Sequence, residues 1–118
     1  MRLVLTPLLI GAAGIASAEG YAIYDLGEVT DRPACLHRAT KVMNAWNRQT
    51  GEQGILDPTE WIVYGWDFAP GDNDVLIMCP IFRDSFVNAL LVVHGEGTDQ
   101  ERNRVADGIE RLWTGDSP

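Results

Sequence analysis

Three runs of the sequence are rich in β-branched and aromatic residues, and each is bounded by residues that favour turns. They span residues 61–68, 75–82 and 86–94. Pro70 and Gly71 separate the first two runs, with Pro before Gly as the two central positions of a type II turn require. Polar residues 83–85 separate the second run from the third. Runs of this composition favour strands. The pattern therefore predicts a three-stranded antiparallel meander.

Hydrophobic residues on both sides of the meander recur at helical spacing. Residues 31–50 begin with Asp31 as a candidate N-cap and Pro33 in the first turn, and Gly51 follows as a stop signal. The apolar face of this helix comprises Cys35, Ala39, Val42, Met43 and Trp46. A second helix begins at Thr98, which matches the capping box together with Glu101. Its apolar stripe comprises Val105, Ile109, Leu112 and Trp113.

The remaining segments of the chain are short. Residues 21–26 predict an N-terminal strand that ends at Gly27, residues 51–60 predict a loop, and residues 114–118 predict a tail. Two amphipathic helices can cover one face of a small sheet. We therefore expect one α+β domain over residues 19–118, a two-layer sandwich in which two helices pack on the meander in the order (β)αβββα.

The first 18 residues have the pattern of a cleavable signal peptide. Arg2 supplies the positive start, residues 3–15 are apolar, and residues 16–18 read Ala-Ser-Ala, which is a typical cleavage site. The apolar run is too short to span a membrane, and no stop-transfer pattern follows it. We expect a periplasmic or secreted protein that begins near Glu19 and has no membrane contact after cleavage.

The two cysteines, Cys35 and Cys79, are expected to form a disulfide in an oxidising compartment. A reactive thiol is the alternative, but no Cys-x-x-Cys motif is present. Because Cys35 lies on the apolar face of the first helix, the bond would fasten that helix to the second strand. Side chains that alternate with Cys79 then face the helices, namely Val75, Ile77 and Ile81. Pro80 has no N–H to donate and is expected to end the ladder or to bulge it.

The other face of the predicted sheet is unusually apolar. Alternation places on it Ile62, Tyr64, Trp66, Phe68, Leu76, Met78, Phe82, Phe86, Asn88, Leu90, Val92 and His94. An antiparallel sheet usually exposes a polar second face to water. Either the N-terminal strand or a loop covers this face, or it binds a ligand, a protein partner or a second copy of the chain. The expected binding residues are Tyr64, Trp66, Met78 and Leu90, because aromatic residues and Met dominate interface energetics.

Acidic residues dominate the expected mature chain, which carries 17 Asp and Glu against eight Lys and Arg, a formal charge of −9. This balance argues against nucleic acid and against anionic membrane surfaces as partners. The order helix–three strands–helix is also that of double-stranded-RNA-binding domains, but the charge and the export signal argue against that function. A basic protein partner is compatible with the charge.

No residues form a strong catalytic, metal or cofactor motif. His37 faces away from Cys35 on its helix, whereas His94 ends a strand beside Glu96 and could act as a base or as a metal ligand. Residues 67–74 contain three Asp but lack the distal Glu of a calcium-binding EF-hand loop, and no glycine-rich phosphate loop is present. We expect no cofactor and no metal.

The sequence favours a non-catalytic binding module of the cell envelope, such as an inhibitor or accessory protein that meets a larger, basic protein. Two hypotheses from other classes remain open. One is a small hydrolase that uses His94 with Glu96 or a nearby Asp, and the other is a carrier of an apolar ligand.

Overall fold

The computed structural model describes residues 19–115, so the expected signal peptide and the last three residues lie outside the described part of the chain. The described elements are β1 (Gly20–Val29), α2 (Arg32–Gln49), β2 (Ile55–Pro58), β3 (Ile62–Phe68), β4 (Asn73–Met78), β5 (Ile81–Phe82), β6 (Phe86–Gly95) and α3 (Asp99–Thr114). The predicted α+β class and two-helix order are confirmed, with additional short strands.

All six strands belong to one antiparallel sheet in the order β1-β6-β4-β3-β2, and β5 pairs with β6 beyond the end of β4. Strands β3, β4 and β6 are neighbours and form the predicted meander. Strand β1 is longer than predicted, because Gly27 marks a register shift rather than the end of the strand. The expected loop at residues 51–60 contains β2, which pairs with β3 and forms the far edge of the sheet.

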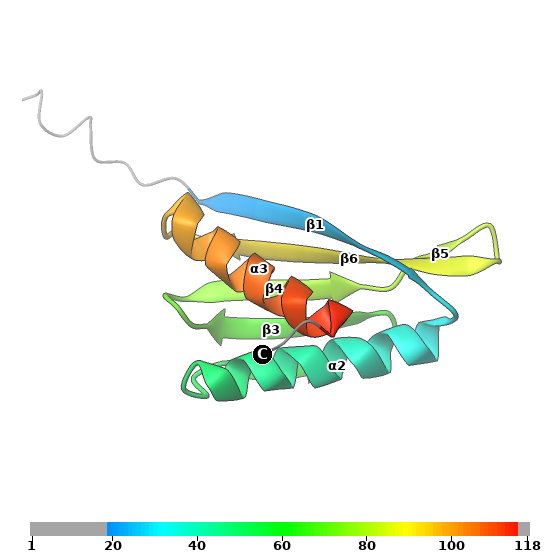
Figure 1. Cartoon of the computed structure of the whole chain (residues 1–118), viewed down its shortest axis with the longest axis horizontal. Helices are drawn as coiled ribbons and strands as arrows, with labels where there is room; N and C mark the ends of the chain where they lie inside the picture. The colour runs from blue at the N-terminus through cyan, green and yellow to red at the C-terminus, as the bar shows by residue number, and fades with distance from the viewer. Residues whose placement is uncertain (1–18, 116–118) are drawn as a thin grey trace, which may run out of the picture.

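Both helices lie on the same face of the sheet (Figure 1). Asp31 caps α2 by accepting a hydrogen bond from the N–H of Ala34, and Thr98 and Glu101 form the predicted capping box of α3. The helices approach each other at Gly108, where a β-carbon would lie 2.0 Å from Cζ3 of Trp46. None of the helices within residues 19–115 is long and apolar enough to cross a membrane.

The hydrophobic core lies between the sheet and the two helices. Its fully buried members include Ala39, Met43, Val63, Val75, Ile77, Leu91, Val93, Val105 and Ile109. The predicted disulfide is present, and it joins Cys35 in α2 to Cys79 directly after β4, with 6.1 Å between the two α-carbons. Both cysteines are fully buried. The bond therefore fixes which face of the sheet α2 covers.

Two residues differ from what the alternation predicts. Ile81 lies opposite the core residue Val87 and so keeps its predicted helix side, but the strand breaks at Cys79 and Pro80, and Ile81 is exposed in β5. Phe68 is predicted on the opposite face but is fully buried. The ladder between β3 and β4 shifts register before Phe68, at a point where Asp67 has a φ of 59°, and this irregularity turns the Phe68 side chain into the core.

Strand β1 extends the sheet and is anchored to α3. The Tyr24 hydroxyl donates a hydrogen bond to the Asp107 carboxylate, and Nε1 of Trp113 donates to the backbone carbonyl of Leu26 at 3.1 Å. Both bonds join β1 to α3 on the helix side of the sheet. The alternative in which the N-terminal strand folds over the other face is therefore wrong.

Removing the disulfide is expected to destabilise the protein by about 4 kcal/mol, because the bond spans 44 positions of the chain and restricts the unfolded state. The Cys35→Ala/Cys79→Ala double variant avoids a free thiol. Denaturant unfolding of the oxidised protein, the reduced protein and the double variant measures the loss. The last two should agree, and an unfolding midpoint that reduction leaves unchanged would contradict the assignment.

The contact between β1 and α3 makes a prediction about pH. The hydrogen bond to Asp107, followed by burial and by the charges of Asp107 and Glu110, raises the pKa of Tyr24 to about 12. A tyrosine in the unfolded chain titrates near pH 10, so the folded state holds this proton more tightly. The contact therefore stabilises the fold below about pH 10, and its contribution is lost as the pH rises through about 12.

Absorbance titration of tyrosinate in the mature protein should reveal one tyrosine that ionises late. The variant Tyr24→Phe should remove this component, whereas the control Tyr64→Phe should retain it. The variant Asp107→Asn should lower the pKa of Tyr24, because a neutral amide no longer opposes the phenolate. A late tyrosine that persists in Tyr24→Phe would contradict the anchoring of β1 to α3.

Candidate functional site: the open face of the sheet

The face of the sheet turned away from the helices, here called the open face, carries side chains that align across the strands. The rows are Tyr21–His94–Asp74, Ile23–Val92–Leu76–Tyr64–Asp57 and Asp25–Leu90–Met78–Ile62. Trp66 and Ile55 form a further pair at the β2 edge, and Phe82 and Phe86 form one in the β5–β6 hairpin. The described elements are the sheet strands and two helices on the other face, so no described element covers this one.

Several large apolar side chains of the open face are exposed. Tyr21, Ile23 and Ile55 expose 65, 66 and 64% of their surface, and Trp66 exposes 40%. Ile62 is the exception: it is buried on this face, although it does not belong to the main core. Exposed apolar patches of this kind are typical of interaction surfaces in proteins.

The four predicted binding residues share this face. Tyr64 and Trp66 project from β3 with their rings stacked, the ring centroids 5.4 Å apart. Met78 in β4 pairs with Leu90 in β6, and Tyr64 lies opposite Leu76 in β4. The structure thus brings the four residues together on the three central strands, while their role in binding stays a prediction.

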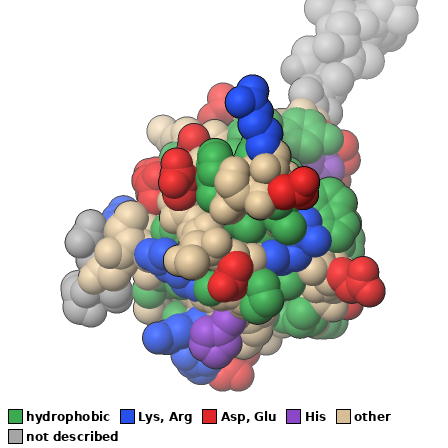
Figure 2. Space-filling view, turned by 90° about the vertical axis from the view of Figure 1, so that its right-hand side faces the viewer, with side chains coloured by type: hydrophobic (Ala, Val, Ile, Leu, Met, Phe, Trp, Pro, Cys, Tyr) green, Lys and Arg blue, Asp and Glu red, His purple; other side chains and the backbone are tan. Residues whose placement is uncertain are grey.

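Charged side chains are distributed unevenly between the two layers. Of the eight Lys and Arg in residues 19–115, four belong to α2, three to α3, and the eighth is Arg83 in the turn between β5 and β6. The strands contain none. The carboxylates at open-face positions are Asp25, Glu28, Asp57 and Asp74. Figure 2, a view onto one end of the molecule, shows hydrophobic side chains at the surface among Asp, Glu, Lys and Arg side chains.

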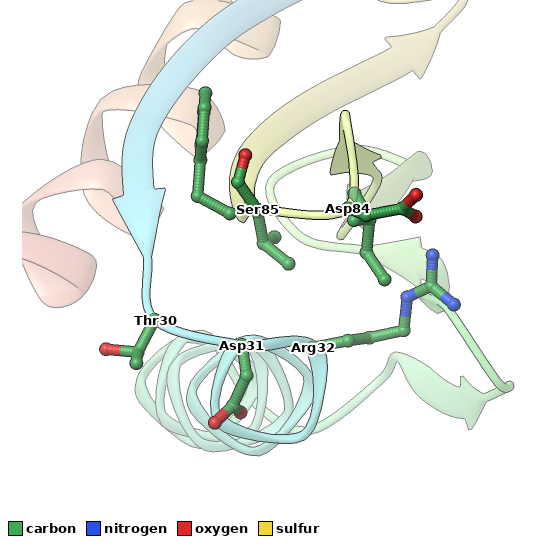
Figure 3. Close-up of a pocket in the computed structure, with 8 residues that line it drawn as sticks. Thr30, Asp31, Arg32, Asp84 and Ser85 are labelled. Atoms are coloured by element: carbon green, nitrogen blue, oxygen red, sulfur yellow. The ribbon is translucent and has the colours of Figure 1, made fainter.

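The β5–β6 hairpin extends past the end of β4 (Figure 1). It has a cavity on each side. One, of about 150 Å³, lies between the hairpin and the junction of β1 with α2. Figure 3 shows Thr30, Asp31 and Arg32 on the junction side of it and Asp84 and Ser85 on the hairpin side. The fold already uses two of its charged groups, because Asp31 caps α2 and Nε of Arg32 donates to the carbonyl of Cys79 at 3.1 Å.

The second cavity, here called the hairpin cavity, has a volume of about 320 Å³ and lies on the open face. Its lining residues are Asp25, Phe82, Phe86, Asn88 and Leu90. Oδ1 of Asp25 accepts hydrogen bonds from Nδ2 of Asn88 at 2.7 Å and from the N–H of Gly27 at 2.8 Å. The bond from Asn88, followed by that from Gly27, lowers the pKa of Asp25, so the group is a carboxylate at neutral pH. The Phe82 and Phe86 rings stack with centroids 5.8 Å apart.

His94 lies at the end of β6 opposite the hairpin. Its Nε2 is 3.1 Å from Oε2 of Glu19, and its ring stacks on Tyr21 with the centroids 4.5 Å apart. Asp74 is its partner across the β4–β6 ladder. Within the described chain the hydrogen bond of His94 goes to Glu19 and not to Glu96, which was the carboxylate predicted first.

Other catalytic candidates are far from His94 or isolated. Ser85, the only serine within residues 19–115, lies in the turn directly before β6, nine positions before His94, a separation of roughly 30 Å for an extended chain. His37 is exposed on α2. Across residues 19–115, no three His, Cys, Asp or Glu side chains are grouped to hold a metal ion.

Sequence reasoning missed three parts of the open face. Tyr21 and Ile23 alternate with inward-facing Ala22 and Tyr24, but only the pairing of β1 with β6 assigns them to a face. Ile55 lies in a four-residue strand that ends in Pro58 and has no clear strand pattern. The hairpin cavity exists because β5 is separate from β4. The sequence predicted a single continuous strand over residues 75–82, and such a strand would leave no hairpin cavity.

Comparison of the chain with models of protein families, with curated proteins and with solved structures found no significant match to any of them.

Proposed function

We propose that this chain is a non-catalytic protein-binding module of the cell envelope, and that its open face docks a basic protein. One observation carries the proposal. The sheet presents apolar and aromatic side chains at its centre and carboxylates around them, while the strands within residues 19–115 hold no Lys or Arg. A protein interface has a similar plan, with an apolar centre and a polar rim.

Charge determines which kind of partner fits. An acidic rim attracts a basic surface, speeds the encounter and disfavours acidic partners. The stacked Tyr64 and Trp66 rings provide the large aromatic anchors that dominate interface energetics. The buried disulfide fits a protein that folds in an oxidising compartment, where such a partner would be met after export.

The two other hypotheses have less support. A hydrolase based on His94 needs a substrate cleft and a second catalytic group, but His94 contacts Glu19 and Tyr21 at the end of β6 and lines neither of the two cavities described above. A carrier of an apolar ligand needs an enclosed apolar pocket. The hairpin cavity opens on the surface and contains the Asp25 carboxylate.

The proposal can be tested by photo-crosslinking in the native envelope, with a benzophenone amino acid at position 64 on the open face. The matched control places the same group at Lys41, which is exposed on α2. We expect position 64 to capture one basic envelope protein that position 41 does not capture. The product should decrease as salt rises, because ions screen the attraction between exposed charges.

The variant Trp66→Glu should weaken binding of the captured protein by roughly 30-fold or more, the range for loss of an aromatic hot spot. His37→Glu adds the same charge on the helix side and should have little effect. Circular dichroism of both variants checks the fold. Capture of a second copy of this chain, capture of an acidic protein, or equal capture from position 41 would contradict the proposal.

A further inference from the structure

The hairpin cavity combines a carboxylate with an exposed aromatic pair. Asp25 lies on its β1 side, Phe82 and Phe86 lie on its hairpin side, and Leu90 and Asn88 of β6 complete the lining. Phe82 is 43% exposed, so the ring surface is accessible. The volume of about 320 Å³ lies at the lower end of the range for small-ligand pockets and suits one long side chain.

The Asp25 carboxylate has no cationic partner in the part of the chain that the structure describes. The ion pairs there are His94 with Glu19 and Arg102 with Asp99. Both hydrogen bonds to Asp25 go to Oδ1, and within residues 19–115 Oδ2 accepts none. The bonds from Asn88 and Gly27 hold the group in one position and keep it ionised. This fixed charge is available to a cation that enters the cavity.

Docking over the open face would make such a cation necessary. A partner that covers Leu90 and Met78 also covers Asp25, because Asp25 and Leu90 are direct neighbours across the β1–β6 ladder and Leu90 pairs with Met78. Burying an ionised carboxylate is strongly unfavourable unless an opposite charge accompanies it. A guanidinium meets this requirement better than an ammonium, because it is planar, stacks on aromatic rings and pairs with a carboxylate through two N–H groups.

We propose that the hairpin cavity is a recognition site for an arginine side chain of the partner, whose guanidinium pairs with Asp25 and stacks on the Phe82–Phe86 pair. The inference rests on the proposed function in taking the occupant to be part of a docked basic protein. The cavity would thus set the register of the partner on the sheet, as a charged anchor at one end of an apolar surface.

L-arginine amide serves as the probe, because it carries the guanidinium without the partner. We expect it to bind the mature protein in the millimolar range and to shift the NMR signals of the Asn88 side-chain amide and the Gly27 N–H in a saturable manner. L-norvaline amide, which lacks the guanidinium, should not shift these signals. L-lysine amide should bind several-fold more weakly, because an ammonium cannot stack as a plane.

The variant Asp25→Asn removes the charge and keeps an acceptor oxygen for Asn88 and Gly27, and it should weaken arginine amide binding at least tenfold. Asp57→Asn makes the same change at the β2 edge of the open face and should leave binding unchanged. Phe82→Leu should also weaken binding, with the hairpin retained. Shifts that do not saturate, or that are equal in wild type and Asp25→Asn, would overturn the arginine site.

The same variants separate this inference from the proposed function. If the captured partner binds Asp25→Asn as tightly as it binds the wild type, the docking function stands and the arginine site is wrong. If arginine amide binds the cavity as described but position 64 captures no basic protein, the guanidinium site stands and the docking function is wrong.

Discussion

One-sided coverage of the sheet is the constraint on which the rest of this structure depends. A sheet with two apolar faces needs two layers to cover it, yet the described chain provides two helices on the same face. The disulfide between Cys35 and Cys79 fastens α2 to that face, and the bond between Tyr24 and Asp107 joins β1 to α3 there. With β1 held in the sheet, the opposite face keeps its exposed aromatic residues, and they carry the proposed function.

Local signals predicted the parts of the fold that depend on neighbouring residues. Asp31 and the pair Thr98 and Glu101 mark the starts of the two helices, and period-two alternation assigned Val75, Ile77 and Cys79 to the core. The same alternation placed Tyr64, Trp66, Met78 and Leu90 on one face. The disulfide followed from the compartment and from the apolar position of Cys35.

Features that depend on pairing between distant segments could not be predicted in this way. The register shift near Asp67 moves Phe68 into the core, and no residue pattern in the sequence predicts this shift. The break at Pro80 was expected, but its result, a separate hairpin with Ile81 exposed and a cavity beside Asp25, depends on how β5 pairs with β6. The hydrogen bond that Asn88 donates to Asp25 joins residues 63 positions apart and appears only when β1 takes its place in the sheet.

The most direct test of this account measures the solvent exposure of Trp66 in the mature protein. Fluorine-labelled tryptophan gives a separate NMR signal for each of the four side chains, and single Trp→Phe variants assign them. An uncharged paramagnetic gadolinium chelate should broaden the signal of Trp66 strongly and that of Trp113 weakly, because Trp66 is 40% exposed and Trp113 is 3% exposed. Protection of Trp66 equal to that of Trp113 in a monomer would show that the chain covers its own open face, and it would contradict the central claim.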